Sequence, residues 1–203
     1  MNEDLTQVVQ ISEGESRKFV ILQFGDDDYK SNLKIELIGE GASVEVQGLY
    51  FAGSGQNIQN RVTIMHKAKN CKSRVLYKGV LKDKGTRTNW VGTVKIEPEA
   101  TGTDTYEENR NLLLTRGVRA LSEPNLEILT GDIENAGHAS ATGRFDDEQL
   151  FYLMSRGISK KDAKRLVVEG FFGEVLNSLK DNNDISEQDL EKIQLEISTK
   201  LSA

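Results

Sequence analysis

The chain has 203 residues, a mass of 22.6 kDa, a net charge of −6 and a mean hydropathy of −0.48. This length fits one domain, or one large unit with a small appendage. The acidic balance argues against a general nucleic-acid binder, because no basic excess is available to neutralise phosphates. No apolar run approaches the ~20 residues that a membrane-spanning helix needs, so the sequence predicts no membrane association.

Other features of the composition favour a reducing cytoplasm. The first residues, Met1-Asn2-Glu3-Asp4, are acidic and do not resemble a secretory signal. Cys71 is the single cysteine and has no partner for an internal disulfide. Two histidines, His66 and His138, are too few for a three-histidine metal site. We therefore expect a cytoplasmic protein.

Residues 1–143 are expected to form a mainly β domain. Fifteen of the 18 glycines and both prolines lie there, and they separate short runs with period-two alternation of apolar and polar residues. The expected strands are Phe19–Phe24, Leu33–Ile38, Val44–Phe51, Val62–His66, Ser73–Leu81, Asn89–Ile96, Asn111–Leu114 and Leu126–Leu129. No repeat of fixed length is legible, so this pattern leaves a sandwich, a barrel and a parallel β-solenoid open.

Residues 144–203 are expected to form a helical domain with three helices. Asp146 can cap the first helix, and Gly157 is suited to end it in a left-handed conformation. Ser159 with Asp162 forms a second capping pair, and Ser186 begins a third helix, which carries an apolar stripe at helical spacing.

The sequence contains little that would make it an enzyme by itself. It has no GxxxxGK[ST] or GxGxxG nucleotide-binding pattern, no GxSxG elbow and no HExxH or CxxC pair. We expect no bound nucleotide, and any ATP dependence would come from a partner. The enzymatic alternative is a β-helical carbohydrate-active enzyme, in which Asp132 and Glu134 would share one strand face and act as an acid–base pair. The favoured explanation is that both carboxylates only solvate the outward face of the strand.

Two further candidates have simpler structural explanations. His66 continues the period-two series of Val62 and Ile64, which favours a packed, hydrogen-bonded histidine over a metal ligand. Cys71 lies in the basic stretch 67–72, which would lower the pKa of an exposed thiol. An ordinary cysteine at a strand edge is favoured there.

His138 is the strongest candidate for a functional side chain. It lies among small residues bracketed by Gly137 and Gly143, which would let another backbone, subunit or cofactor approach closely. A neutral imidazole can bind iron, zinc or copper. One histidine does not make a site, so a metal role would require ligands from another chain. The spacing alone does not choose between a ligand and a structural histidine.

The stretch around His138 belongs to an ordered series of motifs. The motifs are His66-x3-Asn70-Cys-Lys-Ser73, Tyr77–Leu81, Asn109–Leu114, Ser122–Ile128, Gly137–Asp146, Glu148–Leu153, Ser155–Ile158 and Gly170–Leu176. This series resembles the carboxy-terminal half of the SufB/SufD family, the scaffold subunits of the SUF iron–sulfur cluster assembly machine. The resemblance runs from about Gly39 to Leu179.

The resemblance implies a right-handed parallel β-helix followed by a small C-terminal α-helical domain. It also implies a non-enzymatic scaffold that pairs with a SufB-like subunit through the β-helix ends and binds a SufC-type ABC ATPase through its helical tail. His138 matches the family histidine associated with a transient iron–sulfur cluster at the subunit interface. Asn135-Ala136 stands where the SufB-like pattern has cysteine, so the chain is SufD-like.

The resemblance leaves several points open. Candidates for binding the ATPase are Phe151, Tyr152, Arg156, Phe171 and Phe172, although the aromatic rings could instead pack on the β domain. A self-paired homodimer is an alternative to pairing with a SufB-like chain. Family members are much longer, so the sequence is either a naturally short member or a fragment. Cys71 receives no functional role.

Overall fold

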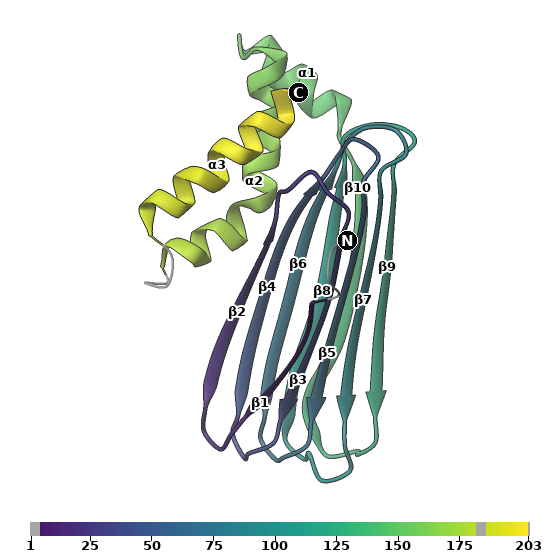
Figure 1. Cartoon of the computed structure of the whole chain (residues 1–203), viewed down its shortest axis with the longest axis vertical. Coiled ribbons are helices and arrows are strands. Elements are labelled where there is room, and N and C mark those ends of the chain that lie inside the picture. Colours follow the sequence, from purple (N-terminus) through teal and green to yellow (C-terminus); the bar gives the residue numbers. More distant parts are fainter. Residues whose placement is uncertain (1–4, 182–185, 203) are drawn as a thin grey trace.

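The computed structural model describes residues 5–181 and 186–202. In this part of the chain ten strands are followed by three helices (Figure 1). The strands are β1 (Leu5–Ile11), β2 (Ser16–Gln23), β3 (Tyr29–Leu37), β4 (Ser43–Ala52), β5 (Asn57–His66), β6 (Lys72–Leu81), β7 (Arg87–Ile96), β8 (Thr103–Leu113), β9 (Arg119–Ile128) and β10 (Ile133–Arg144). The helices are α1 (Asp147–Ser155), α2 (Lys160–Lys180) and α3 (Glu187–Ser202). The acidic segment 1–4 lies outside the described residues.

The strands form a parallel β-solenoid. The odd-numbered strands make one sheet in the order β1-β3-β5-β7-β9, and the even-numbered strands make a second in the order β10-β8-β6-β4-β2. Every paired neighbour is parallel. Each turn contributes one strand to each sheet, which gives five turns with the core between the sheets. The expectation of a mainly β solenoid with a helical tail is confirmed.

The length of the turns explains why no repeat is legible in the sequence. Leu5 lies beside Ser31 in the first sheet, an offset of 26 residues. Arg87 lies beside Arg119 in the same sheet, an offset of 32 residues. Because the loops lengthen along the solenoid, equivalent positions drift out of any fixed sequence period, although the strands remain in register.

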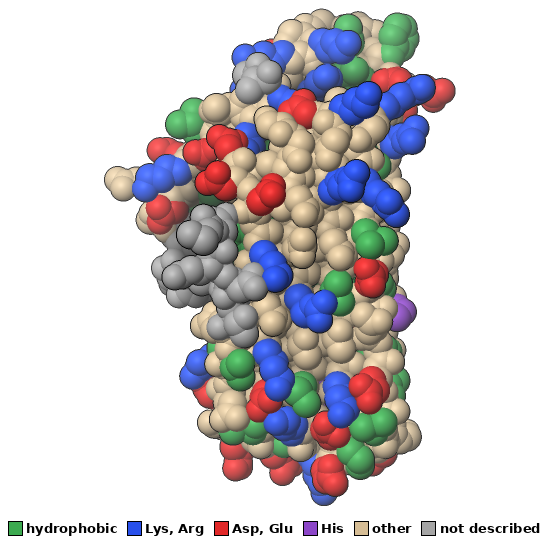
Figure 2. Space-filling model, turned by 45° about the vertical axis from the view of Figure 1, so that its right-hand side comes forward, with side chains coloured by type: hydrophobic (Ala, Val, Ile, Leu, Met, Phe, Trp, Pro, Cys, Tyr) green, Lys and Arg blue, Asp and Glu red, His purple; other side chains and the backbone are tan. Residues whose placement is uncertain are grey.

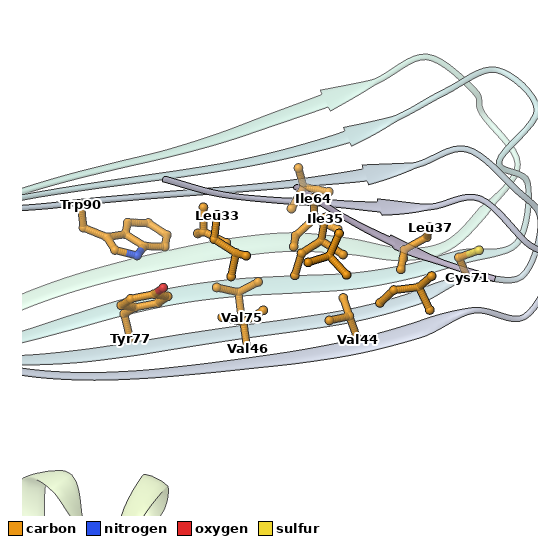
Figure 3. Close-up of a cluster of buried hydrophobic side chains, with 14 of the residues drawn as sticks. Leu33, Ile35, Leu37, Val44, Val46, Ile64, Cys71, Val75, Tyr77 and Trp90 are labelled. Carbon is orange, nitrogen blue, oxygen red and sulfur yellow. The ribbon is translucent and has the colours of Figure 1, made fainter. Parts of the chain in front are cut away.

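The core between the sheets follows the alternation seen in the sequence. In β5 every second residue is buried, including Val62 and Ile64. Figure 3 shows Tyr77 of β6 facing Trp90 of β7 across the interior, and their ring centroids are 5.9 Å apart. Gly79 of β6 leaves room for the ring of Tyr50, because an added Cβ there would lie 1.9 Å from that ring.

Two strands depart from the sequence expectation. Leu5–Ile11 and Ile133–Arg144 form β1 and β10, which the alternation did not single out. The second of these segments consists largely of glycine, alanine, serine and threonine, so it has little hydrophobic contrast. Its strand conformation is fixed by pairing with β8 rather than by its own pattern.

The helices lie at one end of the even-numbered sheet, and there α2 packs on the outer face of β4 and β6 (Figure 1). This contact buries a second apolar cluster that includes Leu49, Phe51 and Phe172. Both faces of β4 are therefore buried over its last residues, whereas the alternation of apolar and polar residues in its sequence predicted one solvent-exposed face. Among the described residues, no helix combines the length and apolar character that crossing a membrane requires.

The predicted helix starts are confirmed by local hydrogen bonds. Asp146 caps α1 by accepting a bond from the Glu148 amide at 2.8 Å. Ser159 caps α2 by accepting one from the Asp162 amide at 3.1 Å. Gly157 follows α1 in the left-handed region, with φ +85°.

Candidate functional site

The last turn of the solenoid has an open side. Within the described chain, β9 and β10 each pair with only one neighbour in their sheet, and neither strand contains a fully buried residue. Figure 2 turns this end toward the viewer, and much of its middle shows backbone and uncharged polar side chains rather than hydrophobic ones. The open side therefore leaves unpaired backbone groups along small side chains, to which another strand could add.

His138 lies in the middle of β10 with an exposed side chain. It is in register with Glu107 of β8, whose side chain is buried inside the solenoid. Neighbours in register on parallel strands point to the same side of the sheet. His138 therefore stands at the open end of the interior, where it remains accessible to solvent.

The preceding turn of the solenoid, whose strand β8 pairs with the His138 strand, is lined by polar groups that the sequence analysis missed. Every second residue of β8 from its start faces inward and is buried, namely Thr103, Thr105, Glu107, Asn109 and Asn111. Asn109 donates to the Tyr50 hydroxyl at 3.2 Å, and Asn111 donates to the Asn109 carbonyl oxygen at 2.8 Å. A period-two polar series normally marks a wet face. Here it faces inward, and the only signal in the sequence was that these positions contain no apolar residue.

Glu107 differs from its neighbours because it has no hydrogen-bonding partner. Its side chain is completely buried, and both carboxylate oxygens are unsatisfied among the described residues. Burial raises the pKa of Glu107 to about 7, and the Asn125 backbone, which lies nearby without making a full hydrogen bond, opposes this shift. Glu107 is thus an isolated carboxyl group directly beside the His138 strand.

His66 is a packed histidine, as predicted. Its side chain is buried, and its Nε2 lies 2.9 Å from the Ser73 hydroxyl, which lies 2.6 Å from the Thr105 hydroxyl. Burial lowers the pKa of His66 to about 4, and the negative charge of Asp104 partly opposes the shift. His66 is therefore held neutral inside the solenoid, away from solvent.

Cys71 has the environment of a structural thiol. It is buried in the main core, with its Sγ 3.2 Å from the carbonyl oxygen of Gly39. Burial raises the pKa of the Cys71 thiol. Because the thiolate is the reactive form, the basic neighbours do not make Cys71 a nucleophile.

The two carboxylates of the enzymatic alternative do not share a regular strand face. Asp132 precedes β10, and Glu134 lies at a register irregularity between Ile133 and Asn135. Both residues are exposed. The β-bulge interrupts the alternation on which the expected pairing of these carboxylates depended.

The candidate docking residues divide into two groups. On α1, Phe151 is 74% exposed, Tyr152 is 57% exposed, and the Arg156 guanidinium lies 5.4 Å from the Tyr152 ring centroid. Phe171 is half-buried, and Phe172 is completely buried in the cluster between α2 and the sheet. Phe172 is therefore removed from the docking candidates, because its side chain already packs on the β domain.

The described residues contain no group of three or more His, Cys, Asp or Glu side chains placed to hold a metal ion. A metal site at His138 would need at least one additional ligand.

The sequence was compared with protein-family models and with known proteins, and both comparisons found matches over most of the chain. Residues 5–171 match the model of the SUF system FeS cluster assembly, SufBD core domain. An iron–sulfur cluster assembly SufBD family protein of Mycobacterium leprae is 51% identical over 168 residues, which cover 80% of this chain and 43% of that protein. The iron–sulfur cluster assembly protein SufD of Bacillus subtilis is 38% identical over 156 residues, covering 76% and 35%. SufD of Escherichia coli is 32% identical over 152 residues, covering 75% and 36%. The chain thus spans less than half the length of these relatives.

Proposed function

The chain belongs to the SufBD family, and from this premise we propose that it is a SufD-like scaffold subunit that pairs with a SufB-like chain during iron–sulfur cluster assembly. The single observation that carries the proposal is the exposed His138 on the open last turn, beside the unpaired edge of β10. Such an imidazole can contribute to a coordination pocket completed by a second polypeptide. The cluster is cargo, built at the interface and released from it.

The edge of β10 supports the pairing step. Its backbone groups are unpaired on one side, and its small side chains allow a second strand to approach. Strand addition from a SufB-like chain would satisfy these groups and bring further ligands beside His138. A homodimer would use the same edge, and sedimentation of the isolated chain tests whether it forms.

The helical region supports the second partnership. Phe151 and Tyr152 expose large aromatic surfaces on α1, and aromatic residues are enriched among the residues that dominate binding energy at interfaces. We infer that this helix binds a SufC-type ABC ATPase, while residues 1–143 hold the cluster interface and residues 144–203 form the docking domain. The proposed setting is a reducing cytoplasm.

The His138 assignment is tested by His138→Ala in the complex with both partners. Because the ring is exposed, the free energy of unfolding should change by no more than about 0.5 kcal/mol, while cluster assembly falls. Ser140→Ala is the matched control, since Ser140 is exposed two residues further along the same strand. Unchanged cluster assembly, or a large loss of stability, would contradict the assignment.

The partnerships are tested by mixing the chain with a SufB-like subunit and an ABC ATPase at micromolar concentration and measuring association by gel filtration. Replacing Phe151 and Tyr152 together by serine should weaken ATPase binding by about tenfold or more. Leu195→Ser on α3 is the control, because Leu195 is 66% exposed on a different helix. The scaffold proposal is wrong if neither partner associates with the unmodified chain.

A further inference from the structure

Glu107 is a buried carboxyl group whose surroundings do not stabilise its charge. Its side chain is completely buried in β8, and neither carboxylate oxygen has a hydrogen-bonding partner among the described residues. Among residues 5–181 and 186–202, no basic side chain contributes to its electrostatic environment, so these residues do not balance its charge. A buried polar group without a partner costs about 1–3 kcal/mol, and more when it is charged. Leucine at this position would avoid that cost.

The surrounding residues leave room for this carboxylate rather than satisfying it. Gly92 of β7 faces Glu107 across the interior, and an added Cβ there would lie 2.5 Å from Glu107 Oε2 and 2.2 Å from Cη2 of Trp90. The Trp90 indole Nε1 is also buried, and no described residue accepts a hydrogen bond from it. A glycine thus keeps a space that a carboxylate and an indole ring share.

The same carboxylate lies next to the functional candidate. Glu107 and His138 are in register on adjacent parallel strands, whose backbones are about 4.8 Å apart, so both side chains point to the same side of the sheet, which is the interior. One contributes carboxylate oxygens and the other an imidazole nitrogen. Oxygen and nitrogen donors of this kind suit divalent first-row transition metals, including ferrous iron. The open last turn exposes the His138 imidazole to a small cation, and the buried Glu107 carboxylate lies on the neighbouring strand, one step further into the interior.

We propose that Glu107 and His138 together form a two-donor site for a divalent transition metal at the open end of the solenoid. This inference rests on the proposed function, in which His138 lies at the assembly interface, and it adds a second ligand from the same chain. Ferrous iron is the cargo that the site takes. The partner subunit supplies the remaining ligands, and the metal balances the buried negative charge of Glu107.

The test uses the full chain and Co²⁺ as an oxygen-stable probe, titrated to millimolar concentration at pH 7.5. Bound Co²⁺ should give visible absorption bands. It should also quench the fluorescence of Trp90, the single tryptophan, because the indole ring lies beside the Glu107 carboxylate. The two signals should share one midpoint, and a chelator should reverse both.

Two variants locate the ligands. Glu107→Gln preserves the shape of the side chain and removes the anionic donor, and His138→Ala removes the imidazole; each should weaken Co²⁺ binding about tenfold or more. Glu134→Gln is the matched control, because it removes an exposed carboxylate from β10 and should leave the affinity within about twofold. Circular dichroism checks that each variant is folded.

The results separate this inference from the proposed function. Failure of the unmodified chain to bind Co²⁺ or to show quenching of Trp90 overturns the two-donor site, as does a Glu107→Gln variant that binds normally. Both results leave the scaffold function intact if His138→Ala still impairs cluster assembly in the complex. If partners bind neither the unmodified chain nor its variants while Co²⁺ binding follows the expected pattern, the scaffold proposal fails and the metal site stands.

Discussion

Replacing Glu107 by glutamine should reveal a pH dependence of stability that the unmodified chain conceals. Two completely buried groups titrate in overlapping ranges, and their effects have opposite signs. The pKa of Glu107 is raised from 4.5 to about 7, and the pKa of His66 is lowered from 6.5 to about 4. Both shifts have the same main cause, the loss of water around a group that would carry charge.

The sign of each effect follows from which state binds the proton more tightly. Folded Glu107 holds its proton more tightly than the unfolded chain does, so its contribution is fully present below pH 4.5 and is lost as the pH rises to about 7. Folded His66 holds its proton less tightly, so stability is lost as the pH falls from 6.5 to about 4. Each effect amounts to about 3 kcal/mol. Between pH 4.5 and 6.5 the two slopes nearly cancel.

The Glu107→Gln variant removes one of these slopes. Its free energy of unfolding should therefore rise by about 2 kcal/mol between pH 4.5 and 6.5, relative to the change in the unmodified chain, because this window covers most but not all of the shift. Urea unfolding followed by circular dichroism at several pH values, without added metal, measures this difference. His66→Gln should show the opposite slope, and Glu134→Gln should follow the unmodified chain. Parallel curves for the unmodified chain and Glu107→Gln would falsify the assignment of the raised pKa to Glu107.

Further substitutions test the packing. Gly79→Ala should cost about 1–3 kcal/mol, because its Cβ would collide with the Tyr50 ring, and thermal unfolding measures this loss. Gly173→Ala in α2 meets nothing within 4 Å and should stabilise by about 0.5–1 kcal/mol, so equal effects of the two substitutions would contradict the packing argument. Lys78→Met should cost about 1–3 kcal/mol, because the buried ammonium pairs with Glu174 at 2.8 Å and anchors α2 to β6. A variant that unfolds at the same urea concentration would show that this anchor contributes nothing.

The sequence by itself determined the features that depend on neighbouring residues. The caps at Asp146 and Ser159 were predictable because each hydrogen bond closes within three residues. The burial of His66 followed from its alternation with Val62 and Ile64. The small-residue segment around His138 marked the candidate site before its position in space was known, and the resemblance to the SufB/SufD family implied the architecture.

Only the tertiary structure decided which polar residues face inward and which apolar residues are covered. Glu107 lies on a strand whose alternating polar pattern is equally compatible with a solvent-facing surface. Its partners at Val75 and His138 are 32 and 31 residues away, at offsets that vary along the solenoid. The sequence left Phe172 as a candidate for partner binding, but its side chain is buried where α2 packs on the even-numbered sheet. Burial at these positions results from the stacking of distant turns and helices, and no local sequence pattern encodes that stacking.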